Sequence, residues 1–122
     1  MMDAQWLRIA PCAAIPPREG RVVHIADREI AIFNLGGRFL AVDNRCPHRG
    51  GPLADGIVSG SSVVCPLHAW KIDLETGQVA RPAGPAAPCV ATYPVRVEAG
   101  ILLVRVPVDV PAGATVSDGA AA

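Results

Sequence analysis

Two short segments of the chain bring cysteine and histidine close together. The first reads Cys46-Pro47-His48-Arg49-Gly50-Gly51, and the second reads Cys65-Pro66-Leu67-His68. The pattern is C-x-H, then 16 residues, then C-x-x-H, so each half offers one sulfur and one nitrogen. Two thiolates and two imidazoles suit a zinc ion or a mixed-ligand iron–sulfur cluster. The candidate metal ligands are therefore Cys46, His48, Cys65 and His68.

The pairing within each half bears on which metal is bound. Zinc sites usually pair Cys with Cys and His with His, as in C-x₂₋₄-C followed by H-x₃₋₅-H, whereas both pairs here are mixed. Mixed pairs suit a two-iron cluster in which one iron takes both cysteines and the other both histidines, because each loop then reaches both irons. Replacing two thiolates by neutral imidazoles raises the reduction potential from about −400 mV to between about −150 and +300 mV. A structural zinc site on the same residues is the alternative.

The residues around the four candidate ligands favour the cluster. Pro47 and Pro66 fix the backbone just after each cysteine. Gly50-Gly51 allows the backbone to approach closely. Backbone N–H groups in such loops can donate to sulfur, which helps a cluster to hold an added electron.

The segments Cys46-Pro-His-Arg-Gly-Gly-Pro-Leu and Cys65-Pro-Leu-His resemble the Rieske 2Fe–2S family, and the resemblance covers roughly residues 5–106. It implies that Cys46 and Cys65 bind the buried iron, and that His48 and His68 bind the outer iron through Nδ1. It also implies a one-electron carrier whose electrons leave by the outer faces of the two histidines. No catalytic residue is expected on the chain.

The chain departs from the respiratory members of that family, which carry an additional cysteine in each loop and a serine that hydrogen-bonds the cluster. Gly51 and Leu67 stand where those cysteines would be expected, and Ala69-Trp70 replaces the Gly-Ser pair. The resemblance thus implies a potential near the bottom of the Rieske range.

The segments 65–77 and 89–97 resemble the small subunit of assimilatory NAD(P)H nitrite reductases, in which a tryptophan follows the second histidine by two positions, as Trp70 does. This favours an electron-relay subunit beside a large sirohaem- and flavin-containing subunit that reduces nitrite to ammonia. The alternative is a Rieske ferredoxin that accepts electrons from a ferredoxin reductase and delivers them to an aromatic-ring-hydroxylating oxygenase. A zinc-binding interaction module is the alternative from another class.

Short strands must position these loops. Alternating or apolar stretches predict strands at 21–25, 29–33 and 39–42, with a hairpin turn at Gly36-Gly37, and a second hairpin of 93–97 and 101–106. A turn of helix is expected at 52–56. The prediction is an all-β, Rieske-type fold: an antiparallel β base domain over residues 1–106, an inserted two-loop cluster-binding subdomain at about 43–88, and a flexible tail at 107–122.

Composition narrows the function further. With 122 residues the chain fits one domain, and its 11 basic and 11 acidic residues cancel, which gives no electrostatic basis for a nucleic-acid partner. No signal peptide or membrane span is visible, so we expect a cytoplasmic protein, where structural disulfides are rare. Cys12 and Cys89 are expected to be packed thiols. His24 is expected to be a surface or hydrogen-bonded residue, and Trp70 a packing residue.

Overall fold

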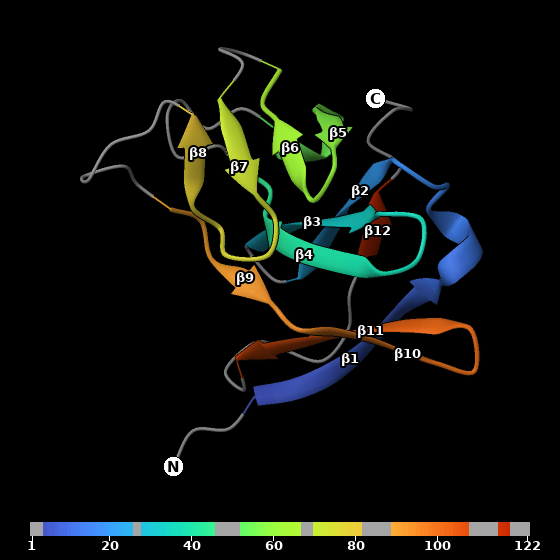
Figure 1. The fold of residues 1–122 in the computed structure, drawn as a ribbon. Coiled ribbons are helices and arrows are strands. Elements are labelled where there is room, and N and C mark those ends of the chain that lie inside the picture. Colours follow the sequence, from blue (N-terminus) through green and yellow to red (C-terminus); the bar gives the residue numbers. More distant parts are fainter. Residues whose placement is uncertain are drawn as a thin grey trace.

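The computed structural model describes residues 4–25, 28–45, 52–66, 70–81, 89–107 and 115–117. Within these residues the chain forms three antiparallel sheets, which lie one above another as layers (Figure 1). The helical elements among them are two short 3-10 turns, η1 (Cys12–Ala14) and η2 (Leu53–Asp55). The predicted all-β, antiparallel fold is confirmed, and η2 lies where a turn of helix was expected.

The first layer is a sheet of order β1-β11-β10. It contains β1 (Ala4–Pro11), β10 (Val95–Glu98) and β11 (Ile101–Pro107). The β10–β11 hairpin turns at Ala99 and Gly100, where φ is 52° and 79°. Two consecutive positive φ values are typical of the tight type I′ hairpin turn, so the second predicted hairpin is confirmed from Val95 onward. Tyr93 was expected in the same strand but pairs with Ala41 in another sheet. The strand β1 was not among the predicted strands.

The middle layer is a sheet of order β12-β2-β3-β4-β9. It contains β2 (Gly20–Ile25), β3 (Arg28–Asn34), β4 (Phe39–Asp43), β9 (Thr92–Tyr93) and β12 (Thr115–Ser117). Gly36 makes the predicted β3–β4 turn with a φ of 93°, and its N–H donates to Asn34 Oδ1 at 2.8 Å. The strand β12 belongs to the segment expected to be a flexible tail and pairs with β2, while the other residues of 108–122 lie outside the described part of the chain.

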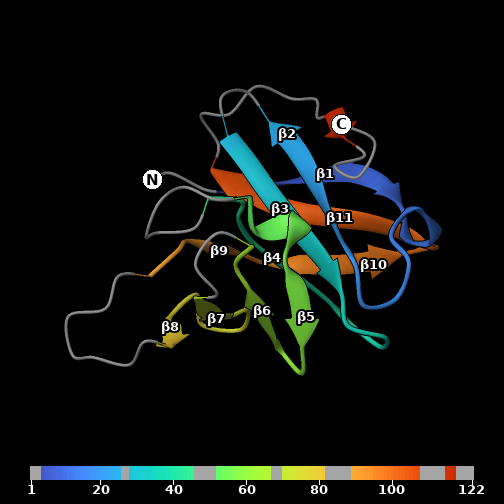
Figure 2. The same ribbon diagram turned by 90° about the horizontal axis from the view of Figure 1, so that it is seen from above.

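The third layer lies within the predicted insert and has the order β5-β6-β7-β8. Its strands β5 (Ile57–Ser59), β6 (Ser62–Val64), β7 (Lys71–Asp73) and β8 (Val79–Arg81) have three residues each. Figure 2 shows them side by side in sequence order. Alternation over three residues is too short to identify a strand from sequence, which explains why the insert was expected to be loops.

The middle sheet is buried on both faces. Along β3, Ile30 and Ile32 pack toward the three-stranded sheet, whereas Ala31 and Phe33 pack toward the four-stranded sheet, and all four side chains are 0% exposed. Two apolar cores therefore lie back to back across one sheet. This arrangement ties the insert to the base of the molecule by packing as well as by the chain.

No helix within the described residues is long and apolar enough to cross a lipid bilayer.

Candidate metal centre

Cys65 is the predicted ligand that the structure describes. It follows β6 directly, is 2% exposed and packs in the core between the middle sheet and the four-stranded sheet. Its backbone N–H donates to the Trp70 carbonyl at 2.7 Å, which closes the base of the 65–70 loop. The other three predicted ligands, Cys46, His48 and His68, lie outside the described residues, and their role stays a prediction.

The base of the first loop is also closed. Arg45 and Pro52 form an isolated antiparallel bridge on either side of 46–51. Next to this bridge, on the side away from residues 46–51, the Leu53 N–H donates to the Asn44 carbonyl at 2.7 Å, and the Ala54 N–H donates to Asn44 Oδ1 at 2.8 Å. One asparagine thus holds the returning chain by both its backbone and its side chain.

The second loop begins and ends at one edge of the four-stranded sheet, whereas the first loop follows β4 of the middle sheet and ends at Pro52, just before η2. Ile57 pairs with Val64, Val64 with Lys71, and Lys71 with Arg81, so these four residues form one row across β5, β6, β7 and β8. We call this the loop-edge row. Cys65 comes directly after it on β6, and the chain arrives at Ile57 from η2 after the first loop. Leu53, which follows the first loop, and Cys65, which begins the second, are buried in the same apolar core.

A third chain segment, 82–88, leaves from the same row after Arg81 and returns at Cys89. Cys89 forms an isolated bridge with Gln78, and the next residue, Val90, donates its N–H to the Gly77 carbonyl at 2.8 Å. Val90 is buried and Cys89 is exposed. The expectation that Cys89 is a packed thiol is therefore wrong, because the strand-like pairing at this point turns Val90, and not its neighbour, toward the core.

The donor set and its surroundings fit a 2Fe–2S cluster. A thiolate in an apolar core is unfavourable without a compensating positive charge, and Cys65 lies in such a core. Among the described residues, no three His, Cys, Asp or Glu side chains gather into a group that could bind a metal ion. The described part thus offers no competing site, and the remaining members of the predicted set, Cys46, His48 and His68, stay predictions from the sequence. A bound Rieske cluster would take up and release one electron there.

A polar network surrounds the chain just before the first loop. Asn44 is 3% exposed, and its Nδ2 donates to Glu29 Oε1 at 3.2 Å. The other oxygen of Glu29 lies 3.6 Å from the Arg45 guanidinium, whose side chain is 71% exposed. Buried polar groups need such partners, because an unpaired one costs free energy. This network fixes the strand end from which the first loop departs.

Tyr93 extends the network onto β9. Its hydroxyl donates to Asp43 Oδ1 at 2.7 Å and accepts from Arg28 Nη1 at 3.1 Å. Burial raises the pKa of the Tyr93 phenol above its ordinary value, and Asp43 raises it further, while Arg28 acts in the opposite direction. A cavity of about 260 Å³ lies beside this group, lined by Arg28, Glu29, Asp43 and Arg45.

Other residues considered in the sequence have structural surroundings. Trp70 is partly buried and packs against the core beneath the four-stranded sheet, as expected. Cys12 is partly buried and packs against the other core. His24 is partly buried on β2, opposite Glu29 on β3 and Thr115 on β12. None of the three lies in a metal-binding group with other described residues.

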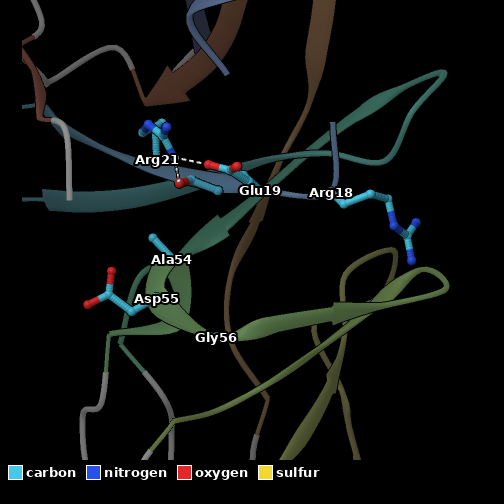
Figure 3. A pocket seen from close by; sticks show the side chains of 7 residues that line it. Arg18, Glu19, Arg21, Ala54, Asp55 and Gly56 are labelled. Carbon is cyan, nitrogen blue, oxygen red and sulfur yellow. Dashed lines mark hydrogen bonds and ion pairs between the residues drawn. The ribbon is translucent and has the colours of Figure 1, made fainter. Parts of the chain in front are cut away.

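Figure 3 shows a second hollow, of about 240 Å³, where η2 faces the chain entering β2. Arg21 Nη1 donates to Glu19 Oε1 at 3.0 Å and to the Gly20 carbonyl at 2.8 Å, while the Arg18 side chain reaches the Gly60 carbonyl at 3.4 Å. Asp55 and Gly56 line the opposite side. Neither cysteine nor histidine lines this hollow, so it does not compete with the loops as a thiolate–imidazole site.

Sequence relatives and solved structures agree with this geometry. A curated relative, the ferredoxin subunit of 3-phenylpropionate/cinnamic acid dioxygenase from Escherichia coli strain K12, is 36% identical over 102 residues, which is 82% of this chain and 94% of that protein. The structure of a Sphingomonas yanoikuyae B1 ferredoxin matches with a TM-score of 0.74 at 30% identity, over 84% of this chain and 100% of that one. A candidate nitrite reductase NADPH small subunit shares the fold, with a TM-score of 0.71 at 22% identity over 82% of this chain and 97% of that one.

The family model for the Rieske [2Fe-2S] domain matches residues 5–94, a range that contains both loops and all four predicted ligands. The chain therefore belongs to the Rieske [2Fe-2S] domain family, whose cofactor is a Rieske-type 2Fe–2S cluster, and it is an electron-transfer component of an oxidoreductase system.

Proposed function

We propose that this protein is a Rieske ferredoxin that carries one electron at a time from a reductase to an aromatic-ring-hydroxylating oxygenase. The observation that supports this proposal most strongly is the 36% identity to a dioxygenase ferredoxin subunit over 94% of that protein's length. In this proposal Cys46, His48, Cys65 and His68 hold the cluster. The buried position of Cys65 at the closed base of its loop supports its part in that set.

A second candidate is the small subunit of an assimilatory NAD(P)H nitrite reductase in the cytoplasm. The segments 65–77 and 89–97 favour it, since Trp70 stands two positions after His68. In this case the chain would relay electrons within a complex, and nitrite would be reduced on a large sirohaem- and flavin-containing subunit. The indole of Trp70 packs into the core, so Trp70 also has a structural reason to be present, which makes it weaker evidence than the ferredoxin relative.

The two candidate functions differ in the protein that accepts the electron. The test is to reduce the iron-loaded protein with dithionite, remove the excess reductant and mix it with either acceptor. A ferredoxin reoxidises when it meets the substrate-loaded oxygenase of the 3-phenylpropionate/cinnamic acid system under oxygen. A nitrite reductase subunit instead reoxidises only with the large subunit and nitrite. Reoxidation with the second pair and not with the first would overturn the ferredoxin proposal.

Ligand variants test the cluster assignment itself. We expect Cys46→Ala and Cys65→Ser to lose iron and labile sulfide, because each thiolate would bind the same iron. His48→Cys and His68→Cys are expected to retain a cluster of lower potential, because a thiolate brings negative charge that an imidazole does not. The exposed Cys89 supplies the matched control, since Cys89→Ser removes a thiol without removing a proposed ligand. Iron content that is unchanged in Cys65→Ser, or zinc in place of iron, would contradict the assignment.

A further inference from the structure

The three-stranded sheet has one side that faces away from the other two sheets (Figure 1). Its inward-facing side chains belong to the core shared with the middle sheet: Leu7, Val95, Leu102, Val104 and Val106. Because side chains alternate along a strand, their neighbours point outward: Trp6 and Arg8 on β1, Arg96 on β10, and Leu103 and Arg105 on β11. We call these five residues the outer face.

Packing accounts for three residues of the outer face. Leu103 is 7% exposed although it belongs to neither core. The Arg96 guanidinium lies 4.3 Å from the centroid of the Trp6 ring, and Arg96 is also the direct partner of Leu103 across β10 and β11. The stacked arginine and tryptophan therefore shield Leu103 from water. Glu98 Oε2 lies 2.8 Å from Arg96 Nε and completes the group.

Arg8 and Arg105 are not explained in this way. Both are exposed, and neither guanidinium forms a hydrogen bond or ion pair with another described residue. Arg8 is the direct partner of Leu103, so Arg105, two residues farther along β11, is its diagonal neighbour at about 7–8 Å. Arg96 is a diagonal neighbour of Arg105 by the same count. Three cations thus lie close together, and their mutual repulsion is unfavourable in the isolated protein.

The spacing of the two unpaired guanidiniums fits an acidic chain in an extended conformation. Alternate residues of a strand point the same way and are about 6.7 Å apart, which is close to the separation of Arg8 and Arg105. Two carboxylates in the pattern Glu-x-Glu can therefore each meet one guanidinium, whose planar donors match a carboxylate. The cavities of about 240, 330 and 260 Å³ in the described part have other residues in their walls, so the outer face offers a sheet surface and not a small-molecule pocket.

Other occupants match the outer face less well. A nucleic acid or an anionic membrane favours a broadly basic protein, whereas the 11 basic and 11 acidic residues of this chain cancel. A second copy of the chain would have to offer one of its own acidic pairs at alternate positions, which are Asp27 with Glu29 and Asp73 with Glu75. Glu29 and Glu75 already accept hydrogen bonds from Asn44 at 3.2 Å and from Arg38 at 2.7 Å.

We infer that the outer face is a docking surface for an acidic, extended segment of another protein, whose carboxylates bind Arg8 and Arg105. The Trp6 ring beside them offers an apolar surface to the carbon chains of the acidic residues. The middle sheet separates this face from Cys65. A protein held here therefore does not cover Cys65, and the inference holds whichever protein accepts the electron.

Binding of an acidic peptide tests the inference. The probe is the labelled peptide Thr-Glu-Thr-Glu-Thr-Glu-Thr, measured by fluorescence anisotropy with the iron-loaded protein at low salt. Arg8→Gln/Arg105→Gln is expected to raise its Kd about tenfold, and the difference should almost vanish at 1 M salt. The control Arg18→Gln/Arg38→Gln removes the same charge at exposed positions before β2 and before β4 and should leave the Kd within about twofold.

Two results of this experiment would overturn the inference. The first is an equal Kd for the two double variants, because the peptide would then respond only to net charge. The second is equal binding of a peptide with glutamine in place of every glutamate, because carboxylates would then not be recognised. Urea unfolding of both double variants checks that each remains folded.

Trp6 reports where the peptide binds. The sequence contains two tryptophans, so Trp70→Phe leaves Trp6 as the remaining one. Unlabelled peptide should change the Trp6 emission, because the Arg96 guanidinium stacked on the ring gains a carboxylate neighbour. Unchanged emission at saturating peptide would contradict the inference. Tighter binding of heparin or phosphatidylserine vesicles than of the peptide, or self-association that is lost in Arg8→Gln/Arg105→Gln, would assign the face to another occupant and overturn it.

Discussion

Replacing Asn44 by alanine should destabilise the protein at the base of the 46–51 segment, which contains the first two predicted ligands. The change removes the hydrogen bond from Nδ2 to Glu29 and leaves the buried Ala54 N–H without its acceptor. A bond to a partly exposed carboxylate contributes about 1 kcal/mol, and an unsatisfied buried N–H costs about 1–3 kcal/mol. The expected loss in the free energy of unfolding is therefore about 2–4 kcal/mol, which corresponds to a fall in Tm of about 8–16 °C for a chain of this size.

The assay is thermal or urea unfolding of the iron-loaded protein, followed both by circular dichroism and by the visible absorption of the cluster. Asn34 is the matched control, because its side chain also makes two hydrogen bonds, to the Ile15 carbonyl and from the Gly36 N–H, each 2.8 Å long. Asn34→Ala should lower stability without altering the visible spectrum, since its turn is at the other end of β4. A change of less than about 0.5 kcal/mol in the free energy of unfolding of Asn44→Ala would refute the reasoning. A visible-spectrum change in Asn34→Ala as large as that in Asn44→Ala would also refute it.

Three further predictions concern the framework. Tyr93→Phe should reduce the loss of stability that the protein shows above about pH 10. Burial and Asp43 raise the folded-state pKa of Tyr93, so the folded state holds the phenol proton more tightly than the unfolded state, and stability falls as pH rises through the folded pKa. Urea unfolding of both proteins between about pH 9 and 11 measures this difference. Gly77→Ala should lower the free energy of unfolding by more than about 2 kcal/mol, because φ is 78° and a Cβ would collide with the Val90 carbonyl. Gly60→Ala, at a φ of 61° with open space around it, should cost about 1 kcal/mol. Similar losses of stability for the two variants in urea unfolding would contradict the packing argument. Ala99→Asn should raise stability by about 0.5–1 kcal/mol, since Asn tolerates a φ of 52° better than Ala, and an unchanged Tm would count against it.

The hairpins could be predicted from sequence because the residues of a tight turn determine its geometry locally. Gly36 and Gly100 adopt the positive φ that a tight turn requires, and the strands on either side are long enough to show a pattern. The insert could not be predicted in the same way, because β5, β6, β7 and β8 gain their stability from Val63 and Ile72 packing on the middle sheet and not from local preference.

The candidate site was accessible to sequence reasoning as a set of ligand types and spacings, which is chemistry that depends on few neighbours. The exposure of Cys89 and the loop-edge row were not accessible, because both depend on which residues pair across strands. Ile57 and Arg81 are 24 positions apart in the chain, yet they lie in one row through Val64 and Lys71. Only the register of the four-stranded sheet places the exposed Ile57 in one row with Lys71, next to Cys65.

The double burial of the middle sheet limits how this protein can be recombined with its relatives. Alternate side chains of β3 belong to different cores, with Ile32 on one side and Phe33 on the other. A graft that exchanges residues 43–88 for the insert of another ferredoxin would therefore meet Ala31, Phe33 and Val42 as a fixed template. Such a chimera should fold only when the incoming insert offers side chains of matching volume, so the predicted cluster-binding insert cannot be exchanged as an independent module.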